Sequence, residues 1–237
     1  KTLRPNNIEP KAKLSNINIE KFEPLIRFEP YTALDMLTNG FSKNRLLKRA
    51  SIQSSFVGIN PNLLNIDTNT VSIITRAIHG KYAISCKYLS RNSENHTTRE
   101  VKPLCLVFDG KHWMFRAFNS SDGQFKNFNF SRVREPLEKP SIPLNTHEEL
   151  DNDPLWNRQI PLQLEIHPSL TEREKEEIRI DYAIDKDSDE LVITERAALI
   201  FLLKKTWHID DGKYQNNEEK PYFRFKLKNA ELVNSQS

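Results

Sequence analysis

Four basic side chains fall inside or at the ends of segments that the sequence predicts to be β-strands. They are Arg99, Arg116, Lys126 and Arg132. Any one of them could simply point to solvent, but several on one small curved sheet favour a concave cationic patch. Guanidinium groups bind phosphate through paired, charge-assisted hydrogen bonds. The placement of these charges therefore predicts a site for a phosphate-bearing ligand.

The strands that would hold these side chains lie close together in the sequence. Alternating runs rich in aromatic and β-branched residues cover residues 84–90, 101–108, 113–118 and 125–133. A period of two is typical of antiparallel β-structure, and Asp109-Gly110, between the second and third runs, is a strong hairpin signal. We expect a small closed or nearly closed sheet, because closure removes unpaired strand edges.

Two helices are predicted before this sheet. The longer one covers residues 67–79, with Asp67, Thr68 or Thr70 as its cap and Gly80 at its end, and we expect its apolar face to pack against the sheet. A shorter helix is expected over residues 31–38, ended by an Asn-Gly pair.

The order of these pieces resembles the WYL domain of bacterial transcriptional regulators. The likeness is carried by the segments AIHGKYAISCKY, TREVKPL, WMFRAF (residues 113–118) and FKNFNFSRV, and it extends over roughly residues 70–138. Within that group the sequence is most similar to dimeric repressors that control phage-defence gene clusters. The resemblance implies an Sm/SH3-like small antiparallel β-barrel that binds an effector, a nucleotide or a single-stranded oligonucleotide.

The resemblance also implies which residues form the pocket. They are Tyr88, Ser90, Arg99, Arg116, Lys126, Ser131 and Arg132. Tyr88 and Ser90 share a strand face and could meet one ligand, and Tyr88 could stack on a base. Arg116 and Arg132 are expected to meet at one mouth of the barrel and to clamp phosphates, while contributing little to the core.

The sequence departs from the family pattern at three positions. Met114 stands where a histidine is common, Lys126 where an arginine is expected, and Leu104 where a polar residue is common. Lysine keeps the charge of arginine but loses its bidentate fork. The identity of the ligand therefore stays open.

A second folded unit is predicted after a linker rich in proline and acidic residues, in which one helical turn is expected near residues 147–150. Strands are expected over residues 160–167, 191–194 and 222–227, and helices over residues 171–180 and 196–207. Thr171 and Glu174 form a capping box for the first helix. The second helix is apolar nearly all round, which predicts burial on more than one side. The segments LTEREKEEIRIDYAI and ITERAALIFLLKKTWHID resemble the C-terminal extension of the same repressors.

These observations predict mainly β-structure followed by a small α+β domain. The expected divisions are an N-terminal linker or dimerisation segment (residues 1–66), a ligand-sensing barrel (67–140) and a C-terminal dimerisation extension (141–237). Because the helix over residues 196–207 carries more apolar surface than one small domain should hide, we expect a homodimer. The resemblance implies that duplex DNA is bound only through a winged helix-turn-helix domain. We find no such domain in this sequence, where PLIRFEPYTALDMLTNG corresponds to the segment that would follow it.

Composition and motifs argue against several other classes of protein. Hydrophobic residues make up 37% of the chain and charged residues 28%, and the net charge of +3 is too small to imply nucleic-acid binding by itself. No apolar run is long enough to span a membrane.

Cys86 and Cys105 lie in apolar strand-like runs, which favours reduced, buried thiols in a cytoplasmic protein. No zinc motif, phosphate-binding loop or nucleophile elbow is present, so neither a metal nor a cofactor nor an enzymatic activity is expected. The run His208-Asp210-Asp211 is interpreted as a solvated helix end.

The sequence thus favours the ligand-sensing and dimerisation part of a transcriptional repressor. Two alternatives stay open at this point. One is an Sm-like module that binds single-stranded nucleic acid through the same basic residues without a switching role. The other is a dimerisation fragment whose pocket has lost its ligand.

Overall fold

The computed structural model describes residues 8–10, 15–17, 33–34, 66–90, 98–213 and 222–236. The chain divides into two compact units, Lys1–Ile59 and Asn60–Ser237. In the first unit, β1 (Ile8–Pro10) pairs antiparallel with β2 (Ser15–Ile17). Of the helix expected over residues 31–38, only Ala33 and Leu34 are described, both helical, and the rest lies outside the described residues. No helix in the described ranges is long and apolar enough to cross a membrane.

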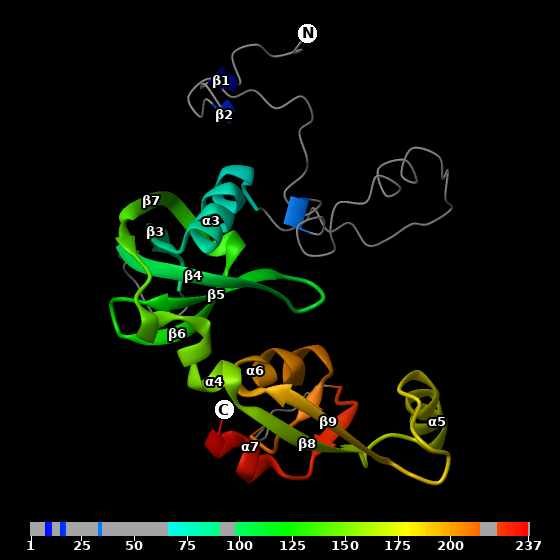
Figure 1. Ribbon diagram of the computed structural model, residues 1–237. Coiled ribbons are helices and arrows are strands. Elements are labelled where there is room, and N and C mark those ends of the chain that lie inside the picture. The colour runs from blue at the N-terminus through cyan, green and yellow to red at the C-terminus, as the bar shows by residue number, and fades with distance from the viewer. Residues whose placement is uncertain are drawn as a thin grey trace, which may run out of the picture. The chain divides into compact units, whose positions relative to one another are not determined.

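The second unit contains the predicted antiparallel sheet, here called the barrel sheet (Figure 1), extended by a further strand in the stretch that was expected to be a linker. Its strands are β3 (Tyr82–Tyr88), β4 (Thr98–Phe108), β5 (Trp113–Asn119), β6 (Gln124–Asn129) and β7 (Val133–Pro143). They are hydrogen-bonded in the order β6-β5-β4-β3-β7, with every neighbouring pair antiparallel. The Asp109-Gly110 turn joins β4 to β5 as expected, with Gly110 at φ 90° and Asp109 Oδ1 accepting from the backbone N–H of His112.

The strand predicted over residues 125–133 is not continuous. It breaks after Asn129 into a 3₁₀ turn, η3 (Phe130–Arg132), which leads into β7. Asn129 causes the break: its Oδ1 accepts from Ser131 N at 3.0 Å and Ser131 Oγ at 2.7 Å. Such local side-chain bonds offer the backbone an alternative to the strand ladder.

Helix α3 (Thr68–Gly80) covers part of the barrel sheet, contacting β3, β4 and β7. Asp67 caps it, accepting from Thr70 N at 2.8 Å, and the buried apolar face includes Val71, Ile74 and Ala77. The left-handed residue at its end is Lys81 (φ 52°) and not Gly80. Gly80 lies inside the last turn, where a side chain would collide with the ring of Tyr82.

A connector of short turns follows β7, where one turn had been expected. It consists of η4 (Thr146–Glu148), η5 (Leu150–Asn152) and α4 (Pro154–Asn157). Asp153 caps α4, with its carboxylate accepting from the backbone N–H groups of Leu155 and Trp156. This connector leads directly into the second sheet.

The C-terminal part is a four-stranded sheet with three helices. Its strands β8 (Gln159–Ile166), β9 (Glu190–Arg196), β10 (Ile209–Asp210) and β11 (Phe225–Leu227) lie in the order β10-β11-β8-β9. Its helices are α5 (Glu172–Asp181), α6 (Ala197–Thr206) and α7 (Ala230–Gln236). Alternate β8 residues, Ile200 of α6 and Phe225 form one buried core. The predicted order of β-rich and α+β parts is confirmed.

Candidate ligand site and its surroundings

Tyr88 lies at the end of β3 and is largely buried, with 8% of its surface exposed. Its hydroxyl accepts from the backbone N–H of Asn129 at 3.0 Å, and its ring meets that of Phe128 edge-on at 5.0 Å between centroids. The guanidinium carbon of Arg99 lies 5.7 Å from the Tyr88 ring centroid. Because Arg99 covers one face of the ring, a base that stacked on that face would have to displace it.

The turn η3 brings further site residues to the end of β3. The carbonyl oxygen of Arg132 accepts from Leu89 N at 3.1 Å, next to Tyr88 and just before Ser90. The half-buried guanidinium of Arg132 makes no hydrogen bond or ion pair with any residue that the structure describes. Five of the seven predicted site residues therefore lie around one end of β3: Tyr88, Ser90, Arg99, Ser131 and Arg132.

Lys126 lies on β6 and is already paired. Its ammonium contacts Asp122 Oδ2, whose carboxylate also accepts from Gln124 N at 3.2 Å. Burial alone would raise the pKa of Asp122, but the bonds from Lys126 and its neighbours outweigh burial and lower it. An anionic ligand at Lys126 would thus have to compete with an ionised carboxylate.

Arg116 contradicts the expectation that it lies at a mouth of the barrel. It is 3% exposed, and its Nε and Nη2 donate to the two oxygens of Asp153 at 2.7 and 3.0 Å. Its Cα partner on β6 is Asn127, so Arg116 and the adjacent Lys126 project from opposite faces of the sheet. Arg116 is a buried structural side chain, and the prediction that it contributes little to the core is wrong.

A second buried ion pair also went unpredicted. Lys102 of β4 donates to both carboxylate oxygens of Glu148, at 2.7 and 2.5 Å, and the two residues are 4% and 5% exposed. Glu148 also accepts from Asn145 N at 2.7 Å. Burial works to raise the pKa of Glu148, but these bonds lower it overall. Together, the two buried pairs fix the connector to neighbouring strands β4 and β5.

Two family models match this chain, one in each of its two sheet-containing parts. Residues 69–136 match the WYL domain, and residues 159–233 match the BrxR transcriptional regulator, C-terminal dimerization domain. The chain carries a WYL domain followed by a BrxR C-terminal dimerization domain.

Its relatives include the DNA-binding transcriptional repressor CapW of two bacteria. The repressor of Escherichia coli (strain KTE188) is 28% identical over 174 residues, covering 73% of this chain and 56% of the repressor. That of Stenotrophomonas maltophilia is 28% identical over 171 residues, covering 66% and 54%. The chain thus spans just over half the length of these repressors. Among solved structures, proteasome accessory factor B/C (PafBC) of Arthrobacter aurescens aligns at a TM-score of 0.32 and 17% identity, over 67% of this chain and 25% of that chain.

The WYL domain also has a hollow that the sequence did not predict. Its volume is about 380 Å³, and it lies between the start of α3, η3 and the start of β7. The polar residues Asp67, Asn69, Arg134 and Glu135 line it together with Phe130. None of the seven predicted site residues is among its lining residues. Its mixed charge gives no preference for an anion.

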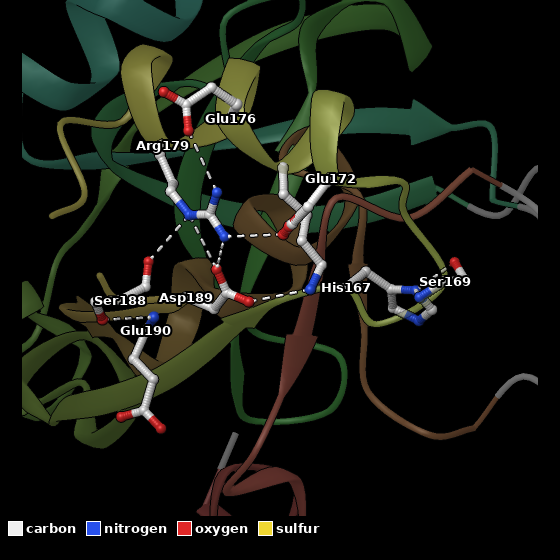
Figure 2. Close-up of polar contacts among 9 residues, drawn as sticks. His167, Ser169, Glu172, Glu176, Arg179, Ser188, Asp189 and Glu190 are labelled. Atoms are coloured by element: carbon white, nitrogen blue, oxygen red, sulfur yellow. Dashed lines mark hydrogen bonds and ion pairs between the residues drawn. The ribbon is translucent and has the colours of Figure 1, made fainter. Parts of the chain in front are cut away.

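In the dimerization domain, one arginine is bonded to several carboxylates of its own domain. Figure 2 shows Arg179 of α5 at the centre of a network, with Nε and Nη2 donating to Asp189 Oδ1 at 3.0 and 2.5 Å and Nη2 also donating to Glu172 at 3.3 Å. Arg179 Nη1 donates to Glu176 at 3.4 Å. The network ties α5 to the turn before β9. The Arg179 guanidinium thus already bonds to three carboxylates.

The acidic run after α6 and the two cysteines complete the residues that the sequence singled out. Asp210 pairs with His167 at 3.4 Å and Asp211 with Lys204 at 3.1 Å. Within residues 66–90, 98–213 and 222–236, no group of three metal-ligating side chains comes together. Cys86 and Cys105 are free thiols, and burial raises the pKa of each to about 11.

Proposed function

We propose that this chain is the ligand-sensing and dimerisation part of a transcriptional repressor, whose WYL domain binds a phosphate-bearing effector, a nucleotide or a single-stranded oligonucleotide. The relatives of the chain are repressors, and its two matched domains are those that a sensor and a dimer would need. We further propose that it regulates phage-defence genes and is not an enzyme. DNA contact would come from a winged helix-turn-helix domain outside the described residues.

The proposed site is supported by two basic residues at the end of β3, Arg99, whose guanidinium lies over the Tyr88 ring, and Arg132, whose carbonyl oxygen accepts from Leu89 N. Within the described residues neither arginine has a carboxylate partner: the Arg99 guanidinium lies over the tyrosine ring, and the Arg132 guanidinium makes no hydrogen bond or ion pair. Half-buried cations without a carboxylate retain most of their capacity to bind an anion. Ser90 and Ser131 supply hydroxyl groups nearby, and Lys126 could join once Asp122 is displaced. Arg116 is not part of the proposed site, because its guanidinium already donates to both carboxylate oxygens of Asp153.

We propose that the dimer forms through the C-terminal domain. Phe201 of α6 is 74% exposed and Val192 of β9 is 64% exposed, although both are large apolar side chains. In α6, Ala197 and Ile200 are buried and the remaining apolar residues are half-buried except Phe201, so Phe201 is the apolar side chain that this helix leaves exposed. A second copy would remove this surface from water.

The test is a fluorescence anisotropy titration of labelled single-stranded oligonucleotides and nucleotides. Arg132→Ala should weaken binding about ten- to a hundredfold, because one charge-assisted pair is lost. Arg99→Ala should weaken it similarly. Arg173→Ala is the control, since Arg173 lies on α5 of the other domain and its side chain is 91% exposed. Equal affinity of the wild type and both site variants would reject the site.

A further inference from the structure

We infer that the buried Arg116–Asp153 pair couples the WYL domain to the dimerization domain, so that a change at the effector site displaces the start of α6. That the effector site drives this displacement rests on the proposed function. The coupling between the two domains is a property of the fold. Asp153 has no exposed surface, and its carboxylate accepts four hydrogen bonds. Two come from Arg116 and two from the first turn of α4. One carboxylate thus holds a strand of the WYL domain and the connector in fixed positions.

The connector passes this constraint to the start of α6. The carbonyl oxygen of Trp156 accepts from Arg196 Nη1 at 2.6 Å, and the Arg196 guanidinium carbon lies 4.8 Å from the Trp156 ring centroid. The carbonyl oxygen of Arg158 accepts from Ala197 N at 2.9 Å. Arg196 ends β9 and Ala197 begins α6, so α4 is bonded to the junction of the two elements.

A second route reaches the same place through Asn127 of β6. Its Oδ1 accepts from Arg116 Nη1 at 3.3 Å, and its Nδ2 donates to the carbonyl oxygen of Ala198 at 3.0 Å. Two routes from Arg116 therefore converge on the first residues of α6. That helix contributes Ile200 to the domain core and exposes Phe201 on the proposed dimer surface.

The other end of the path lies at the proposed effector site. The Tyr88 ring contacts Phe128, and Phe128 stacks on Phe115 with 5.5 Å between centroids. Phe115 immediately precedes Arg116 on β5. Closely packed interiors transmit displacement because they have little free volume. A ligand that moved Arg99 and the Tyr88 ring would thus press on the strand that carries Arg116.

The experiment follows thermal unfolding of the two domains separately, by pulsed hydrogen–deuterium exchange with peptide-resolved mass spectrometry. In the wild type, peptides of β3–β7 and of β8–β9 should lose protection at one temperature. Asp153→Asn should separate the two transitions by about 5 °C or more. Asparagine still caps a helix, so α4 is preserved while the charge pair is lost. Asp189→Asn, which removes one charge from the surface network, should leave the transitions coincident.

A second variant is needed in case Asp153→Asn fails to fold. Arg196→Ala removes the contacts with Trp156 at a half-buried position and should also separate the transitions, by a smaller interval. Coincident transitions in both Asp153→Asn and Arg196→Ala would overturn the inference.

Adding a single-stranded oligonucleotide then distinguishes this inference from the proposed function. In the wild type the oligonucleotide should raise both transitions, whereas in Asp153→Asn it should raise that of the WYL domain alone, with unchanged affinity. Both transitions rising together in Asp153→Asn would also overturn the coupling. An oligonucleotide that fails to bind the wild type would reject the proposed effector, while separated transitions in the variants would still establish the coupling.

Discussion

The WYL domain and the dimerization domain use the same kind of ion pair in opposite settings. The side chains of Arg116 and Asp153 are 4% and 0% exposed, whereas those of Arg179 and Asp189 are 13% and 31% exposed, and Glu172 beside them is 71% exposed. A buried pair must be complete, since removing one partner leaves an uncompensated charge. In an exposed network, water can solvate a charge whose partner has been removed, so the loss of stability is small. The connector is therefore held by buried ion pairs in which the loss of either partner is expected to destabilise the fold.

The largest effect should come from breaking the buried pair. Arg116→Ala should lower the free energy of unfolding by about 3–5 kcal/mol, because Asp153 would stay buried without its cation. Arg179→Ala is the matched control in the other domain, where Asp189 keeps Lys175 at 3.1 Å, and its loss should be much smaller. Urea unfolding followed by circular dichroism measures both. Equal losses would remove the distinction between the two settings.

The Lys102–Glu148 pair should make stability depend on acid pH. The folded-state pKa of Glu148 is lowered, so the unfolded state binds more protons as the pH falls. Its stabilisation is fully present above the unfolded pKa of about 4.3 and is lost as the pH falls through the lower folded value. Glu148→Gln should therefore cost about 3 kcal/mol at neutral pH and progressively less in acid.

Glu149→Gln is the control for this titration, because Glu149 pairs with the exposed Lys81 at 3.0 Å. Chemical denaturation of the wild type and both variants at a series of pH values gives the comparison. A cost of Glu148→Gln that stayed constant down to a pH of about 3 would contradict the direction of the shift in its pKa.

Replacing an exposed apolar residue by aspartate should weaken the dimer when the residue lies in the dimerization domain and not when it lies in the WYL domain. Phe201→Asp should weaken the dimer about thirtyfold or more, since a central aromatic contact is worth about 2 kcal/mol or more. Leu137 of the barrel sheet is 58% exposed, and Leu137→Asp should leave the dimer unchanged. Light scattering over a dilution series reads out both variants. Dissociation by Leu137→Asp alone would move the interface to the WYL domain.

Most of the fold could be predicted because its signals are local. Alternation of residue types predicts β3, β4, β5 and β8, Asp109-Gly110 predicts the hairpin, and the Thr171 capping box predicts the start of α5. The break at Asn129 was missed, although an asparagine two residues before a serine is a recognised turn former. Helix α7 was also not predicted.

The site was less predictable because the role of a charge depends on which face of the strand carries it. The partner of Arg116 is Asp153, which lies in the connector 37 residues further along the chain, and no local pattern predicts a pairing at that distance. Two signals were available in the sequence. A lysine inside an apolar strand, Lys102, suggests a buried partner, and Asp153-Pro154 is typical of a helix start that fixes an aspartate.

The central claim is that Arg116 holds the fold together and Arg132 binds the effector. Measuring oligonucleotide affinity and melting temperature side by side for Arg116→Ala and Arg132→Ala tests it most directly. Arg132→Ala should lose about ten- to a hundredfold in affinity and keep the wild-type melting temperature, while Arg116→Ala should melt well below wild type. An Arg116→Ala variant that melts like the wild type but no longer binds the oligonucleotide, beside an Arg132→Ala variant that binds normally, would contradict the account.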